Sequence, residues 1–317
     1  MNWRAMCKIQ LMLCLLWWMP SVSFSYNSYG YSVPISMKEG LNNNTIYDAH
    51  YGNRGFIWFA TDLGISRYDG FRIRNFPLLS NEDELPDTSI SHAVTSITES
   101  RDGLFCLQLL QGGIVFFDSN KEKYITAHFD RPLNNSSILS FYLTDNHTLY
   151  IGTTDGLYTG EVVREEKNEE EVIGVNLSDD PLVKGEVSGL VGDGKGLIFA
   201  CVGRTKVWAY NPGASKAEFL DRKEGERITK LYLHDDYLWI CPASSEVELY
   251  NLEKGTLHTI EMEERCRRFL SDTFITDIVY ADDRRYFLAT WNGLVSLAFG
   301  LEKLEKATCS FDFPEQS

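Results

Sequence analysis

One short pattern recurs along this chain, and its recurrence limits the folds that the chain can adopt. The first copy, GFIWFATDLGISRYDG at residues 55–70, contains an aromatic residue, small residues, a glycine turn and a second apolar run. The aromatic residues taken as equivalent in the six copies are Trp58, Phe105, Tyr150, Phe199, Trp239 and Phe287. Their separations are 47, 45, 49, 40 and 48 residues. This period is typical of the blades of a β-propeller.

Each copy is flanked by further short runs that are rich in β-branched and aromatic residues. Examples stand upstream at residues 94–98 and 228–232, and downstream at residues 124–129 and 256–260. Turn-forming residues separate these runs, and no 3.6-residue periodicity supports a helical solenoid. The sequence therefore predicts an all-β fold, a β-propeller of four-stranded antiparallel blades.

The sequence predicts the number of blades less directly than it predicts their type. Six repeats are visible, and we expect a seven-bladed ring whose last blade is incomplete. Residues 29–35 are expected to supply an outer strand of the closing blade, and residues 309–313 another late strand. The alternatives are a ring that closes with six blades and a fragment with an open edge, which would favour aggregation.

The first 25 residues have the pattern of an export signal. Arg4 and Lys8 give a positive start, an apolar run covers residues 9–19, and small residues at 23–25 precede Tyr26. We expect cleavage there, which leaves residues 26–317 as the propeller domain; the alternative is a membrane anchor. Loss of the two basic residues would change the formal charge from −15 to −17. This charge disfavours non-specific binding to nucleic acid or to anionic membranes.

Seven cysteines are present, and five follow the expected signal. An odd number at wide spacing does not indicate a disulfide framework. Cys106, Cys201 and Cys241 stand inside apolar runs, and we expect them to be buried free thiols.

The first repeat closely resembles the two-component regulator propeller repeat. The matching stretches are EGLNNN at residues 39–44, GFIW at residues 55–58 and RYDG at residues 67–70. Later copies keep only parts of the last motif, and the likeness extends over residues 29–310. That repeat is found in the periplasmic sensors of hybrid two-component regulators from Bacteroides-type bacteria.

The resemblance implies a periplasmic sensor that recognises oligosaccharides and controls polysaccharide-use genes. In that family the sensor normally holds two seven-bladed propellers, followed by an immunoglobulin-like domain, a membrane helix, a histidine kinase, a receiver and DNA-binding parts. This sequence lacks the later parts and resembles a first propeller cut short, so we expect no enzymatic activity of it. Two partnerships stay open, a homodimer and pairing with remaining receptor domains.

Propeller geometry predicts where a ligand would bind. The turn after the second strand of each blade and the crossover to the next blade share one face. The turns supply Asp62, Gln111, Asp155, Arg204, Ser244 and Trp291. The crossovers supply Arg131, Arg222, Lys223, Arg265, Arg267 and Arg268. We expect this face to bind an oligosaccharide, an anionic one included, with Trp291 stacked on a sugar ring and arginines bonded to acidic groups.

No pattern of catalytic, metal or cofactor residues stands out. The six histidines are scattered, no nucleophile or phosphate-binding motif occurs, and the acidic run at residues 165–171 is expected to be a solvated hairpin tip. The sequence therefore predicts no catalytic residues, no metal and no cofactor. The alternatives to a sensor are a propeller-fold polysaccharide lyase or glycosidase, and a non-signalling binding scaffold.

Overall fold

The computed structural model describes residues 34–78, 92–132, 137–167, 170–194, 196–214, 216–222, 226–243, 246–271, 273–281, 284–300, 304 and 306–312. The chain divides into two units, Met1–Ile35 and Ser36–Ser317. The expected signal peptide and most of the expected strand at residues 29–35 lie outside the described residues. The second unit contains all the described strands.

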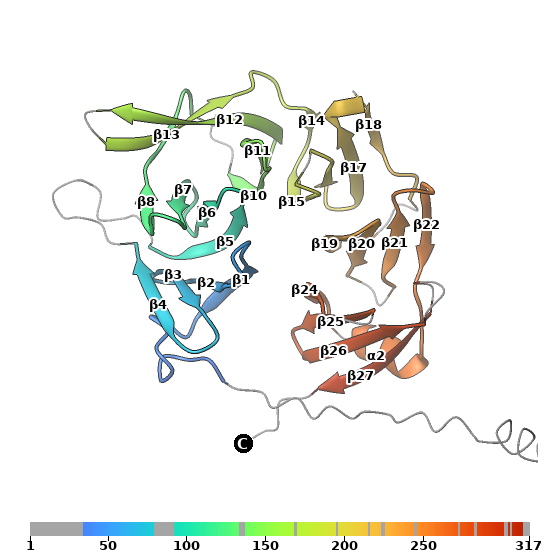
Figure 1. Cartoon of the computed structure of the whole chain (residues 1–317). Helices are drawn as coiled ribbons and strands as arrows, with labels where there is room; N and C mark the ends of the chain where they lie inside the picture. The colour runs from blue at the N-terminus through green and yellow to red at the C-terminus, as the bar shows by residue number, and fades with distance from the viewer. Residues whose placement is uncertain are drawn as a thin grey trace, which may run out of the picture. The chain divides into compact units, whose positions relative to one another are not determined.

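The described strands form six sheets arranged in a ring, which is a six-bladed β-propeller (Figure 1). Within each blade the strands follow one another in chain order from the centre outward, and neighbours are antiparallel. Blade 1 contains β1 (Ile46–Tyr51), β2 (Ile57–Thr61), β3 (Gly64–Tyr68) and β4 (Ile73–Pro77). Blade 2 contains β5 (Val94–Glu99), β6 (Leu104–Leu109), β7 (Ile114–Asp118) and β8 (Lys123–Ile125). Blade 3 contains β10 (Ile138–Leu143), β11 (Thr148–Thr153), β12 (Gly156–Lys167) and β13 (Glu170–Leu177).

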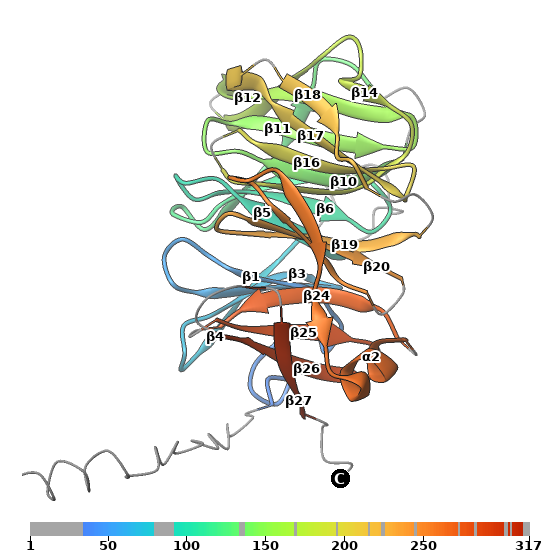
Figure 2. The same cartoon turned by 90° about the vertical axis from the view of Figure 1, so that its right-hand side faces the viewer.

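The second half of the chain repeats this arrangement (Figure 2). Blade 4 contains β15 (Val187–Gly192), β16 (Ile198–Val202), β17 (Lys206–Asn211) and β18 (Lys216–Phe219). Blade 5 contains β19 (Ile228–His234), β20 (Tyr237–Pro242), β21 (Glu248–Asn251) and β22 (Thr256–Thr259). Blade 6 contains β24 (Ile275–Tyr280), β25 (Arg285–Thr290), β26 (Gly293–Phe299) and β27 (Lys306–Asp312).

Short additional elements join the outer edges of the blades. Two of them add parallel strands: β9 (Ala127–Phe129) pairs with β13, and β23 (Glu261–Met262) pairs with β27. A short strand, β14 (Val183–Lys184), also pairs with β12, and η1 (Pro212–Ala214) precedes β18. Helix α2 (Glu264–Ser271) lies in the crossover from blade 5 to blade 6 (Figure 2). Among the described residues, no helix has the length and apolar character needed to cross a membrane.

The inner strand of every blade contains a bulge at the same position. Blade 3 has Leu139 there, and the other five blades have a residue with a hydroxyl group: Tyr47, Thr95, Ser188, Thr229 and Thr276. All three threonines donate a hydrogen bond to a carbonyl of the second strand, as Thr229 does to Cys241 at 3.0 Å. The bulge is thus a repeated feature that bends the inner strand, and a threonine at this position gives the neighbouring backbone a hydrogen-bond partner.

The turn between the second and third strands is also fixed locally. In blades 1, 3 and 6 the second strand ends in threonine, and its Oγ1 donates to the carbonyl of the glycine three residues later. Gly64 has φ of +106°, and an added Cβ there would lie 2.5 Å from the Phe76 carbonyl oxygen. This position therefore requires glycine.

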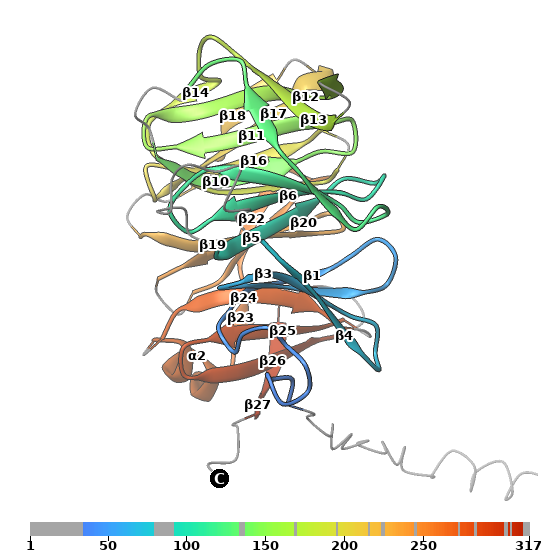
Figure 3. The same ribbon diagram turned by 90° about the vertical axis from the view of Figure 1, so that its left-hand side faces the viewer.

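Aromatic and aliphatic side chains fill the space between neighbouring blades. Trp58 from blade 1 lies edge-on to Phe105 and Phe117 of blade 2, with ring centroids 4.8 and 5.6 Å apart. Trp239 of blade 5 likewise packs against Tyr286 of blade 6. In the side view of Figure 3, blade 2 lies above blade 1, and blade 5 lies above blade 6. The core is therefore a set of layers between sheets.

Several expectations need correction. The late strand at residues 309–313 belongs to β27, the fourth strand of blade 6, so the described residues contain six blades and no part of a seventh. Residues 124–129 form two strands because the chain leaves blade 2 at Thr126 and joins the edge of blade 3. The strand register makes Cys106, and not Phe105, the equivalent of Trp58.

The cysteines show one further difference from expectation. Cys106, Cys201 and Cys241 are buried free thiols, as predicted. Cys266 and Cys309, however, form a disulfide that joins α2 to β27. Sequence spacing could not show this pair, because the fold brings together residues 43 positions apart.

Candidate functional site

The predicted ligand face is defined by strand direction. The second and fourth strands of a blade run in the same direction, so the turn after the second strand and the crossover after the fourth leave from one face. We call it the crossover face; it includes the turns at Asp62, Gln111, Asp155, Arg204 and Trp291. The opposite face, with the turns after the first and third strands, is called the hairpin face. Ser244 and Lys223 lie outside the described residues.

An exposed aromatic pair lies on the crossover face of blade 6. Trp291 is 75% exposed in the β25–β26 turn, and Phe274, directly before β24, is 40% exposed. Their ring centroids are 5.3 Å apart and their planes are inclined by 49°. Thr290 holds this turn, since its Oγ1 donates to the Gly293 carbonyl and accepts from the Asn292 N–H. The repeat pattern indicated Trp291 but not Phe274, because no repeated feature marks the residue before the inner strand.

The predicted acidic and amide residues of this face differ in their hydrogen-bond partners and in their exposure. The Tyr47 hydroxyl donates to Asp62 at 2.7 Å, and this bond raises the pKa of Tyr47. Asp155 accepts hydrogen bonds from Thr153 and Tyr158 and therefore stabilises its own turn. Gln111 is exposed in the β6–β7 turn. These residues share a face, but each belongs to a different blade.

The arginines predicted for this face have acceptor groups within the protein. Ion pairs join Arg131 to Asp179, Arg204 to Glu186 and Arg222 to Glu248. Arg204 and Glu186 are 2.6 Å apart, and the hydrogen bond to Glu186 raises the pKa of Arg204. Because each guanidinium already faces a carboxylate, the local positive potential is smaller than the sequence suggested.

Helix α2 carries the remaining three arginines. Arg267 and Arg268 both lie near Glu264, at 3.5 and 3.0 Å, and Arg265 donates to the Cys309 carbonyl at 3.3 Å. Glu264, Arg265 and Arg268 line a cavity of about 330 Å³. A second cavity of about 160 Å³ is lined by Thr205, Lys206, Phe219, Leu220 and Arg222. The crossover from blade 5 to blade 6 thus presents its three arginines on a helix.

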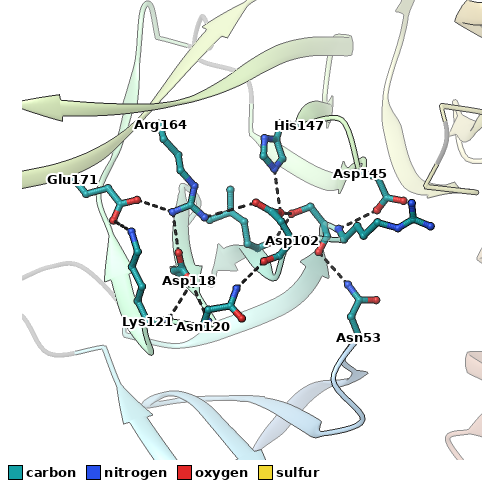
Figure 4. Close-up of polar contacts among 12 residues, drawn as sticks. Asn53, Asp102, Asp118, Asn120, Lys121, Asp145, His147, Arg164 and Glu171 are labelled. Carbon is teal, nitrogen blue, oxygen red and sulfur yellow. Dashed lines mark hydrogen bonds and ion pairs between the residues drawn. The ribbon is translucent and has the colours of Figure 1, made fainter.

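A polar network that the sequence did not indicate lies on the hairpin face (Figure 4). It joins turns of blades 1, 2 and 3. The guanidinium of Arg164 lies 2.8 Å from Asp118, 2.6 Å from Glu171 and 3.8 Å from Asp102. Its outer members are Asn53, Ser100, Arg101, Asn120, Lys121, Asp145 and His147.

The electrostatics of this network favour the charged form of its carboxylates. Burial alone would raise the pKa of Asp118, but the Lys121 N–H, the Arg164 guanidinium and the Asn120 N–H together lower it. Asp102 behaves similarly, since bonds from Ser100 and His147 outweigh its burial and lower its pKa. The pKa of Glu171 is lowered by Lys121 and then by Arg164. Glu171, the last residue of the acidic run that we expected to be solvated, is thus bound by Lys121 and Arg164.

The network lacks the arrangement needed for nucleophilic catalysis. His147 Nε2 lies 3.1 Å from Asp102, and the Ser100 hydroxyl bonds to that same carboxylate and not to the imidazole. A triad requires the histidine to lie between the hydroxyl and the carboxylate. We therefore interpret the network as a clamp between blades. Among the described residues, no group of three or more histidine, cysteine or acidic side chains could hold a metal ion.

Comparisons with known proteins support the fold. The extracellular domain of a candidate one-component system from B. thetaiotaomicron has 14% identity and a TM-score of 0.62, over 88% of this chain and 38% of that one. The extracellular domain of a candidate hybrid two-component system from the same organism has 14% identity and a TM-score of 0.57, over 83% and 35% of the two chains. PorZ, a surface component of the type-IX secretion system of Porphyromonas gingivalis, has 16% identity and a TM-score of 0.59, over 89% and 34%.

The present chain spans roughly a third of the length of these structures. No protein-family model and no curated protein matches the sequence. The resemblance to sensor propellers seen in the first repeat is therefore accompanied by structural similarity to extracellular domains of bacterial regulatory systems. At these identities the similarity concerns the fold.

Proposed function

We propose that this propeller is the ligand-recognising module of a sensor and that it binds an oligosaccharide on the crossover face. The observation that carries the proposal is the exposed pair Trp291 and Phe274. An exposed tryptophan combines an apolar ring face with an N–H donor, so it suits a sugar, which offers apolar C–H faces and hydroxyl groups. The structural neighbours that are extracellular domains of regulatory systems support the sensor role by analogy.

The ion pairs of this face affect which sugars would bind. Arg204 would have to exchange Glu186 for a ligand carboxylate or sulfate, and both partners are at least partly exposed. Such an exchange replaces one ion pair with another and yields little net free energy. We therefore expect neutral oligosaccharides to bind at least as well as anionic ones. In a complete receptor, signalling would require that the ligand prefer one of two receptor conformations.

The export proposal is separate and has its own test. Export to the periplasm with cleavage before Tyr26 would place the propeller where external oligosaccharides arrive. Mass spectrometry of the protein purified from its native cells should find Tyr26 at the N-terminus. A retained Met1 would support an anchor instead.

Calorimetric titration with a panel of neutral and anionic oligosaccharides tests the binding proposal. We expect Trp291→Ala and Phe274→Ala to weaken binding about ten-fold or more, which corresponds to about 1.4 kcal/mol. Phe71→Ala is the matched control, because Phe71 is 95% exposed but lies in the β3–β4 turn of the hairpin face. Unchanged affinity of Trp291→Ala, or no binding across the panel, would refute the proposal. Turnover of a bound oligosaccharide would favour the lyase or glycosidase alternative.

A further inference from the structure

The six blades permit an internal comparison of how each blade–blade junction is covered. The inner strands pack successively as β1 with β5, β5 with β10, β10 with β15, β15 with β19, and β19 with β24. β24 and β1 do not pack in this way, and Figure 1 shows an opening between blades 6 and 1. We call the facing surfaces of these two blades the seam, with Ile46, Ala49 and Tyr51 on one wall and Val279, Phe287 and Leu294 on the other.

Two residues of the blade 1 wall, Ile46 and Ala49, occupy positions that are buried in most of the other blades. Ile46 is 40% exposed, whereas four of its five register equivalents, Val94, Val187, Ile228 and Ile275, are at most 5% exposed. Ala49 is exposed, whereas four of its five equivalents are buried: Ile97, Phe141, Leu231 and Ile278. Each of those four packs against the preceding blade. Phe59, opposite Ala49 on the same face, stays buried, so the uncovered part of the blade 1 wall is the inner strand β1, which has no described blade against it.

The wall on blade 6 shows the complementary pattern. Leu294 is 36% exposed, whereas the apolar residues at its position in the other five blades are at most 8% exposed: Ile65, Ile114, Leu157, Val207 and Val247. Phe287 is half-buried, whereas Trp58, Tyr150, Phe199 and Trp239 at its position are buried. Val279 is 56% exposed.

The two walls have the same chemical character. None of their six named residues carries a charge, although the chain as a whole has a formal charge of −15. Four of the wall residues, Ile46, Tyr51, Val279 and Leu294, are among the large apolar side chains that are exposed on the described residues. A concentration of this kind marks an interaction surface.

We propose that the seam receives a β-sheet with apolar side chains on both of its faces, contributed by a partner polypeptide whose sequence differs from that of this chain. A sheet is the occupant that fits, because at the other junctions these positions are covered by the apolar face of a four-stranded blade. Two facing walls require an occupant that is apolar on both faces. The described strands are already used in the six blades, and β27 is held in blade 6 by β26 and by the Cys266–Cys309 disulfide.

The first test asks whether the seam is open in the isolated protein. Ala49→Cys and Ile97→Cys place a thiol at equivalent positions, one in the seam and one at a covered junction. With a maleimide, the thiol at position 49 should react at least about ten-fold faster, because a covered thiol reacts only during local opening. The wild-type protein gives the background from Cys106, Cys201 and Cys241. Equal rates would show that the ring closes by itself and would overturn the proposal.

The second test identifies the occupant in the native cells. The photo-reactive amino acid p-benzoylphenylalanine replaces Tyr51 on one wall or Phe287 on the other, and Phe71 serves as the exposed control. We expect both wall positions to cross-link to one second chain, at peptides with alternating apolar residues, while position 71 does not. Cross-links to this chain itself, to unrelated peptides from the two walls, or at neither wall would overturn the proposal. This inference does not depend on oligosaccharide binding.

Discussion

Arg164 on β12 and Asp118 at the end of β7 form an ion pair across the junction between blades 3 and 2, with 2.8 Å between nitrogen and oxygen. The Asp118 side chain is 4% exposed, and its other oxygen accepts the backbone N–H groups of Asn120 and Lys121. One carboxylate thus fixes the turn within blade 2 and binds the neighbouring blade. Both the stability of this junction and its response to acid should therefore depend on Asp118.

Removal of the Arg164 guanidinium should destabilise the protein. Arg164→Met leaves the buried Asp118 carboxylate without its cation while keeping the aliphatic part of the side chain. We expect a loss of about 1–3 kcal/mol in the free energy of unfolding, below the full cost for a buried pair because Arg164 is partly exposed. Urea unfolding measures the loss. Lys167→Met on the same strand, paired with the exposed Glu165, is the control and should change little.

Acid should weaken the same clamp. The pKa values of Asp118, Asp102 and Glu171 are lowered in the folded state. Their stabilisation is therefore complete above the unfolded pKa of about 4 and is lost as the pH falls through the lower folded values. Between pH 5 and pH 3 the wild-type protein should lose more unfolding free energy than Asp118→Asn does. Asp179→Asn, at a fully exposed carboxylate, is the control and should follow the wild type; an equal loss in all three would contradict this account.

The repeat predicted the fold because its features are local. Gly64 and the aspartate or asparagine at the end of the third strand in four blades act within a single turn, so their spacing along the chain reports their role. The number of blades was harder to predict, because a single late strand can complete one blade or begin the next. Only the pairing of β27 with β26 assigns residues 309–312 to blade 6.

The candidate sites were predicted less completely, for a physical reason. Trp291 and the arginines of the crossover face could be assigned from strand direction. Phe274 contacts Trp291 and Glu186 pairs with Arg204, so these partners determine how the two side chains can bind a ligand. Each partner lies outside the turn of the residue that it contacts and is brought there by tertiary structure. The Arg164 network joins residues about 45 positions apart, which no local pattern reveals.

The Cys266–Cys309 disulfide should stabilise the last blade. It closes a segment with a sequence separation of 43 residues and joins α2 to β27. A loop of this length gives an upper estimate of about 4 kcal/mol from the chain entropy of the unfolded state. The double variant Cys266→Ser with Cys309→Ser should therefore unfold at lower urea, and amide exchange in β27 should accelerate. Dithiothreitol should destabilise the wild type and leave the double variant unchanged; equal stability of both proteins without reductant would oppose the prediction.

The Thr290 hydroxyl should control how Trp291 is presented. Thr290→Val keeps the shape of the side chain but removes the bond to the Gly293 carbonyl and the acceptor for the Asn292 N–H. Each bond contributes about 0.5–1.5 kcal/mol, so we expect a loss of about 1–3 kcal/mol in the unfolding free energy. Because Trp291 is largely exposed, its position depends on this turn. Amide exchange at residue 292 should therefore accelerate, and oligosaccharide affinity should fall.

The control for this change is Thr308→Val, which removes one hydrogen bond, to the Ala298 carbonyl, from an exposed threonine on β27 of the same blade. It should leave exchange at residue 292 and oligosaccharide affinity unchanged. If Thr290→Val accelerates exchange but leaves affinity intact, Trp291 binds without a fixed turn, and pre-organisation is not part of recognition. If exchange is also unchanged, the threonine does not hold the turn, and the structural role assigned to it in blades 1, 3 and 6 is wrong.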